Sequence, residues 1–150
     1  PEGAGCYCAA NSLLTGFLEK LLGNYAYIVM DNEAGMEHIS RLTTHNVDVL
    51  LIVSDTSRRG VQAGLRINKL ARELKIGVGR SFLVINRARE AVHPDVLAMI
   101  AEDGLPLAGT VPDNETVYQY DFNGKPTIAL DDGNPAVQAA FAIFDKILGI

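Results

Sequence analysis

Apolar residues alternate along the chain between short continuous runs and helical spacing. Four runs have the length and composition of buried strands, and they cover residues 25–30, 47–53, 81–86 and 105–111. Apolar residues three or four positions apart predict helices at 9–22, at 94–102 and at 134–148, and one that begins after cap candidates at 54–57 and runs to about 74. Strands that are apolar throughout and alternate with helices predict an α/β fold, in which a mostly parallel sheet carries helices on both faces.

The spacing also predicts which face of two helices packs on the sheet. In the helix that ends at about 74 the predicted apolar face consists of Gly60, Ala63, Ile67, Leu70 and Leu74. In the final helix it consists of Val137, Phe141, Phe144 and Leu148. Residues 38–44 could form a further short helix, and 112–122 a loop that includes a helical turn.

Composition narrows the class of protein. The 150 residues are 48% apolar and 21% charged, which is typical of one globular domain. The formal net charge of -5 argues against a protein that binds nucleic acid. No run approaches the roughly 18 apolar residues of a membrane span, and no secretory signal is visible. The chain does not begin with Met. We therefore expect the numbering to start inside a longer gene product.

Cys6 and Cys8 are the only cysteines, and one residue separates them. A disulfide across that spacing would be strained, so a reducing, cytoplasmic setting is the simplest interpretation. Two thiolates one residue apart supply half of a tetrahedral site for a soft or borderline divalent metal. A second copy of the chain could supply the other half across a two-fold axis. Two ordinary reduced cysteines explain the pair equally well from the residues alone.

In parallel sheets covered by helices, ligands bind beyond the carboxyl ends of the strands. At the first of these ends, Asp31 could hold a Mg²⁺-bound water, and Gly35 could let a backbone N–H approach a terminal phosphate. A loop cap at Asp31 and a turn at Gly35 are the simpler interpretation of so common a pattern. Asn86 closes the third strand, where its amide could bind a ligand or form a turn.

Several of these segments together resemble one protein family. Asp31-Asn32-Glu33-Ala34-Gly35-Met36-Glu37-His38 resembles the switch II segment of CooC-type carbon monoxide dehydrogenase maturation ATPases, which are relatives of MinD, ParA and the nitrogenase iron protein. The similarity continues through 52–60, 84–87 and 111–114, and residues 2–8 resemble the Cys-x-Cys segment of the family. It covers nearly the whole chain, and the combination is more specific than any single segment.

The resemblance implies a P-loop NTPase fold and ATP or ADP bound with Mg²⁺. Asn86 would read the adenine edge, while Pro112 and Asp113 match the loop that contacts the base. Asp31 and Gly35 would serve hydrolysis. Cys6 and Cys8 would hold Ni²⁺ or Zn²⁺ at the interface of a homodimer, with carbon monoxide dehydrogenase as the client.

One element of the family is missing from these residues. A phosphate-binding loop reads G-x-x-x-x-G-K-[ST], whereas the only Gly-Lys pair, Gly124-Lys125, is followed by Pro126. The resemblance thus implies that residues 1–150 are the C-terminal part of a single MinD/ParA-like nucleotide-binding domain, and that the loop belongs to its missing N-terminal portion. We expect ATP to bind weakly to this piece. Two alternatives remain from the sequence: a MinD/ParA-type positioning ATPase, and a non-enzymatic module that dimerises through metal.

Overall fold

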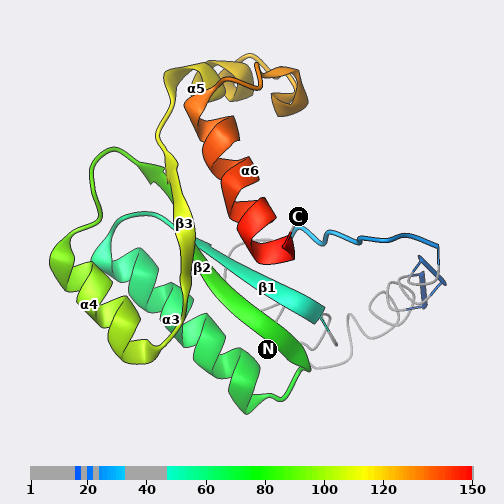
Figure 1. Ribbon diagram of the computed structural model, residues 1–150, viewed down its shortest axis with the longest axis vertical. Helices are drawn as coiled ribbons and strands as arrows, with labels where there is room; N and C mark the ends of the chain where they lie inside the picture. The colour runs from blue at the N-terminus through cyan, green and yellow to red at the C-terminus, as the bar shows by residue number, and fades with distance from the viewer. Residues whose placement is uncertain (1–15, 18–19, 22–23, 33–46, 150) are drawn as a thin grey trace, which may run out of the picture.

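A computed structural model describes residues 16–17, 20–21, 24–32 and 47–149 (Figure 1). Within 47–149 strands alternate with helices, as the apolar pattern predicts. The elements in chain order are β1 (Val47–Ser54), α3 (Arg58–Glu73), β2 (Val78–Ala88), α4 (Pro94–Asp103), β3 (Leu107–Pro112), α5 (Glu115–Phe122), the 3-10 turn η1 (Thr127–Ala129) and α6 (Pro135–Leu148).

The three strands form one parallel sheet in the order β1-β2-β3. Val53 of β1 lies beside Val84 of β2, and Leu83 lies beside Leu107 of β3. This confirms the predicted α/β fold with a parallel sheet. The carboxyl ends of all three strands lie at one edge of the sheet.

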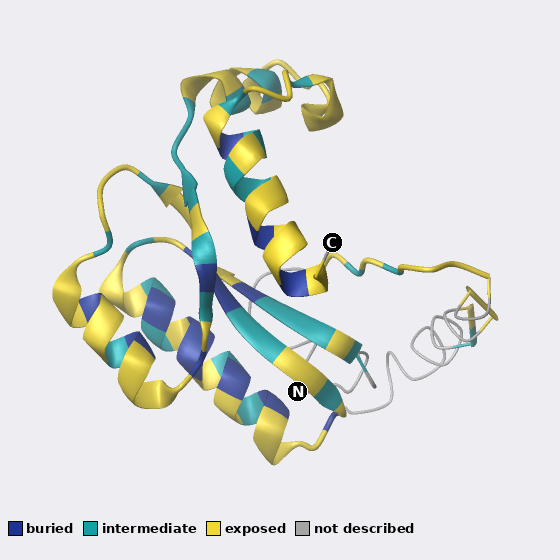
Figure 2. Ribbon diagram, in the orientation of Figure 1, coloured by how far each residue is buried: buried dark blue, intermediate teal, exposed yellow. Residues whose placement is uncertain are grey.

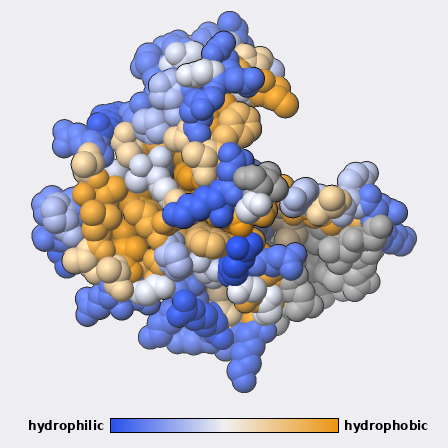
Figure 3. All heavy atoms as spheres, in the orientation of Figure 1, coloured by the Kyte–Doolittle hydropathy of each residue, from blue (hydrophilic) through white to orange (hydrophobic). Residues whose placement is uncertain are grey.

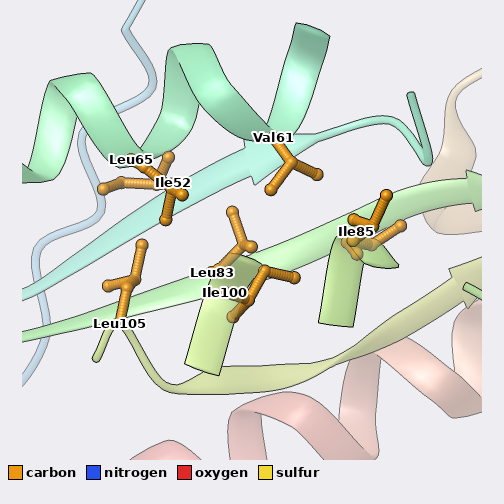
Figure 4. Packing of buried hydrophobic residues seen from close by; sticks show 8 residues of the cluster. Ile52, Val61, Leu65, Leu83, Ile85, Ile100 and Leu105 are labelled. Carbon is orange, nitrogen blue, oxygen red and sulfur yellow. The ribbon is translucent and has the colours of Figure 1, made fainter. Parts of the chain in front are cut away.

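Helices cover both faces, and strand residues alternate between the two cores. On one face Ile52, Leu83 and Ile85 pack with residues of α3 and α4 (Figure 4). On the other face Val84 and Ala108 pack with α6. Figure 2 shows the buried residues where the helices meet the sheet. None of the helices in the part of the chain that the structure describes is long and apolar enough to span a membrane.

Local signals explain where the helices begin and end. Ser57 is the N-cap of α3, and its hydroxyl accepts a hydrogen bond from the Gly60 backbone N–H at 3.0 Å. Pro94 occupies the first turn of α4, where its missing N–H costs nothing. Gly104 and Gly149 close α4 and α6 with φ of 78° and 72°, a conformation that favours glycine.

The predicted packing face of α6 is wrong, and that of α3 is right only for Ile67 and Leu70, which are partly buried against the core. In α3 the buried residues are Val61, Gly64, Leu65, Asn68 and Ala71. Gly64 fixes this face, because a side chain there would come within 3.1 Å of Ile52 Cγ2. In α6 the buried residues are Ala136, Ile143 and Ile147, whereas Phe141 and Phe144 are exposed. Both helices have apolar residues on more than one side, and small residues at the contact select the side that packs.

The predicted strand at 25–30 is also absent. Within 24–32 the chain forms no strand, and Tyr25, Tyr27 and Val29 are exposed. An apolar run becomes a strand only beside a partner that takes up its backbone hydrogen bonds, and none of the three described strands pairs with it. Of the predicted first helix, 16–17 and 20–21 are helical. Its remaining residues and the predicted helix at 38–44 lie outside the described residues, in whole or in part.

Candidate functional site

The carboxyl edge of the sheet gathers polar residues from three strands. β1 ends at Ser54, which Asp55 follows, and β2 carries Asn86 and Arg87 near its end. β3 ends at Pro112, which Asp113 follows. Parallel pairing places Ser54 beside Ile85 and Ala88 beside Pro112. The ends of β2 and β3 therefore lie side by side, at the edge where ligands bind in sheets of this kind.

A bulge shapes the end of β2. The register to β3 shifts between Ile85 and Ala88, and Arg87 has a φ of 55°, the left-handed region that few non-glycine residues occupy. The Arg87 backbone N–H donates to Asn86 Oδ1 at 2.9 Å. This bond holds the Asn86 side chain against the neighbouring backbone and does not involve its Nδ2 group. Asn86 itself is exposed.

Asp113 connects the end of β3 to this bulge. Its backbone N–H donates to the Ala88 carbonyl at 3.0 Å. Its carboxylate accepts a hydrogen bond from Arg89 Nε at 2.8 Å, and Arg87 Nε lies 3.7 Å away. The hydrogen bond from Arg89 is the largest cause that lowers the pKa of Asp113 below its ordinary value, and the charge of Arg87 adds to it. Asp113 is therefore anionic near neutral pH and tied to two arginines.

Asp55 forms a second anionic position at this edge. Its Oδ1 accepts hydrogen bonds from the Ser57 hydroxyl at 2.6 Å and the Ser57 backbone N–H at 2.9 Å. These two bonds lower the pKa of Asp55, and the positive charge of Arg87 contributes less. A Cβ at Gly60 would lie 2.8 Å from Ser54 Oγ, so a side chain there would displace the polar side chains of this turn.

Two asparagines join the starts of α5 and α6. Asn114 caps α5, because its Oδ1 accepts from the Val117 N–H at 3.2 Å, and Asn134 caps α6 through the Ala136 N–H at 2.9 Å. Asn134 Nδ2 also donates to Asn114 Oδ1 at 3.0 Å. The bond closes the excursion 114–134 at its base, one residue after Asp113.

The structure brings three of the sequence-predicted site residues together: Asn86, Pro112 and Asp113. Asp31 is exposed on the segment 24–32, and no described contact joins it to the strand ends. Gly35, Cys6 and Cys8 lie outside the described residues. The described ranges contain no group of three His, Cys, Asp or Glu residues that could hold a metal.

Sequence reasoning missed the arginine partners of Asp113. Arg87 and Arg89 lie two residues apart just beyond a predicted strand, and this pairing of cations was the one signal that could have indicated them. Chemically, the edge offers an amide donor and acceptor at Asn86. It also carries the carboxylate of Asp55 and the ion pairs of Asp113 with its two arginines. That combination suits recognition of a heteroaromatic base or a hydroxyl-rich group rather than a bare metal ion.

The sequence of the chain is similar to those of several proteins that are named as ATP-binding. No family model matches the chain. An uncharacterized ATP-binding protein of Methanocaldococcus jannaschii is 37% identical over 148 residues, which are 99% of this chain and 58% of that protein. The carbon monoxide dehydrogenase accessory protein CooC of Rhodospirillum rubrum is 30% identical over 125 residues, covering 81% of this chain and 46% of that protein. The chain thus spans about half the length of the curated relatives that it matches.

Solved structures show the same fold. The MinD cell division protein of Aquifex aeolicus superposes with a TM-score of 0.75 at 22% identity, over 93% of this chain and 61% of that one. A ParA family ATPase of Chlorobium tepidum gives a TM-score of 0.73 at 18% identity, over 91% of this chain and 56% of that one. The chain therefore shares its fold with MinD and ParA ATPases, and its sequence is similar to proteins that are named as ATP-binding.

Proposed function

We propose that this chain is the C-terminal part of a single MinD/ParA-like nucleotide-binding domain, and that the whole protein uses ATP, with Mg²⁺, to assist nickel insertion into carbon monoxide dehydrogenase. The observation that supports nucleotide binding is the arrangement at the strand ends. Asn86 lies on the bulge at the end of β2. Asp113 stabilises this bulge through a backbone hydrogen bond to Ala88 and ion pairs with Arg87 and Arg89. In this proposal Asn86 reads the adenine edge, and Pro112 and Asp113 border the base.

The client is inferred from one relative. The Rhodospirillum rubrum protein that shares 30% identity with this chain is named as an accessory protein of carbon monoxide dehydrogenase. Cys6 and Cys8 supply the feature that suits such a task, since thiolates bind Ni²⁺ and Zn²⁺ alike. Two chains would hold one metal with four thiolates at a two-fold axis, and a nucleotide-driven change of subunit angle would then act on that metal.

Catalysis is assigned to Asp31 and Gly35, which belong to the segment that resembles switch II. Asp31 would orient a water of the Mg²⁺ ion, and Gly35 would let a backbone N–H reach the terminal phosphate. Replacing Asp31 by Asn in a protein that also carries a phosphate-binding loop should reduce Mg²⁺-dependent ATP hydrolysis. Unchanged hydrolysis would remove Asp31 from the mechanism.

The nickel content of carbon monoxide dehydrogenase tests the proposed task. The complete gene product would be produced with its client in cells, either unchanged or with the double substitution Cys6→Ala and Cys8→Ala. We expect the double variant to yield a client poor in nickel. Tyr7→Phe is the matched control, because it changes the residue between the cysteines and leaves both thiols. A client with full nickel beside the double variant would contradict the proposal.

A positioning ATPase of the MinD or ParA type is the second candidate. The fold shared with such proteins favours it, whereas a metal-binding cysteine pair has no obvious task there. Metal analysis combined with sedimentation distinguishes the two. One metal per two chains, lost in the cysteine double variant, supports the metal-bridged dimer, while a chain without metal supports the positioning ATPase. A metal-bridged dimer that turns over no ATP would instead match the non-enzymatic alternative.

A further inference from the structure

The excursion between Asn114 and Asn134 projects from the body of the protein at the end of β3 (Figure 1). It contains α5 and η1, and neither element has a buried residue. Its base is closed by the Asn134–Asn114 hydrogen bond. The excursion is therefore a defined structure that contributes nothing to either core of the sheet.

Large apolar side chains nevertheless lie on its surface. Tyr118 and Phe122 are 53% and 73% exposed, and their rings stack one helical turn apart with centroids at 6.1 Å. Ile128 of η1 is 93% exposed. Large aromatic residues held on a short helix, with nothing of the described chain over them, are typical of anchors in protein interfaces.

A strand that paired with β1 would lie on the far side of the sheet from these rings. The sheet order is β1-β2-β3, so the pairing edge of β1 lies on the opposite side of the sheet from β3 and from α5, which follows it. The exposed aromatic pair is thus independent of whatever pairs with β1.

The excursion that carries the aromatic pair is negatively charged. The excursion 114–134 contains four carboxylates and a single lysine, so it carries a formal charge of -3 within a chain of -5. Glu115 and Asp121 each lie three residues from Tyr118, so they flank the aromatic pair on the helix surface. The lysine, Lys125, lies over the ring of Tyr120 instead, with its ammonium 5.6 Å from the centroid. Figure 3 shows this projecting part as mostly hydrophilic, with an apolar area at its side.

We propose that Tyr118 and Phe122 form a docking site for a basic segment of a partner protein, in which an apolar side chain packs on the two rings and lysines or arginines meet Glu115 and Asp121. Complementary charge selects this occupant, because an acidic border repels an acidic partner and steers a basic one. The site begins two residues after Asp113, so a bound partner contacts the same chain segment that borders the strand-end site.

A peptide pair tests the site without reference to nucleotide. The probe is a synthetic amphipathic peptide of leucine and lysine, and its control is the same peptide with glutamate in place of lysine. We expect the lysine peptide to bind the chain and the glutamate peptide not to bind. The double substitution Tyr118→Ser and Phe122→Ser should weaken binding about tenfold or more. Glu115→Gln with Asp121→Asn should weaken it less and flatten its dependence on salt.

Phe141→Ser is the matched control, because it removes an exposed aromatic ring from α6 and leaves the docking site unchanged. The proposal is overturned if the lysine peptide does not bind, or if it binds the Tyr118/Phe122 variant as well as the unchanged chain. Sedimentation gives a further decisive outcome. If the unchanged chain is a dimer that the Tyr118/Phe122 variant abolishes, a second copy covers the rings and the proposed partner is wrong.

Discussion

Ser57 has two tasks at the start of α3, and pH separates them. Its hydroxyl accepts from the Gly60 N–H as the helix cap and donates to Asp55 Oδ1. We expect Ser57→Ala to lower the free energy of unfolding by about 1 kcal/mol through the lost cap alone. The lost hydrogen bond to Asp55 adds to this only while Asp55 is ionised.

The sign of the pH effect follows from the lowered pKa of Asp55. A lowered pKa means that the ionised carboxylate stabilises the fold above the ordinary value of 3.8, and that this contribution is lost as the pH falls from there through the lowered value. The difference in unfolding free energy between the unchanged chain and Ser57→Ala should therefore shrink on acidification to about pH 3. Urea titrations at pH 7 and pH 3 measure it, and an equal difference at both would show that Asp55 contributes nothing.

The contact of α6 with β3 depends on the lack of a side chain at Gly109. A Cβ there would lie 2.7 Å from Ile143 Cγ1, so Gly109→Ala must displace Ile143 or the helix. We expect a loss of about 1–3 kcal/mol in the free energy of unfolding. Ile143→Ala leaves a cavity and is costly by itself, yet it makes room for the new methyl group. The double variant should lose less than the two single losses together, and strict additivity would contradict the proposed contact.

The helices show how far apolar spacing predicts packing. The extents of α3, α4 and α6 follow from capping residues and periodicity to within one or two residues, because these signals are local. The packing faces do not follow, since α6 has apolar residues both at Ile143 and Ile147 and at Phe141 and Phe144. The choice depends on Gly109 in a different element. The strand predicted at 25–30 is absent for a similar reason, because a strand requires a partner that its own sequence does not specify.

At the scale of the whole molecule, topology predicts the location of the candidate site but not its contacts. The parallel sheet gathers the strand ends, so Asn86, Pro112 and Asp113 were expected at one edge and lie there. The ion pair between Arg89 and Asp113 joins residues 24 positions apart. It depends on the bulge at the end of β2 and on the left-handed backbone at Arg87. Neither feature leaves a regular signature in the apolar pattern, so the pairing of the arginines with Asp113 cannot be predicted from the sequence.

The same arrangement predicts how tightly the 150-residue chain binds adenosine and ATP. Its strand ends carry the groups proposed to read the base, whereas no stretch of its sequence forms the G-x-x-x-x-G-K-[ST] loop that binds phosphates. We therefore expect adenosine and ATP with Mg²⁺ to bind this chain with similar, weak affinity, because the phosphates find no backbone cradle. Calorimetry with both ligands measures the difference. Asn86→Ala should weaken both to the same extent, since the base is common to them, while Phe141→Ser on α6 should affect neither. If ATP binds about tenfold more tightly than adenosine, a gain of about 1.4 kcal/mol, then other groups of this chain hold the phosphates and the prediction is wrong.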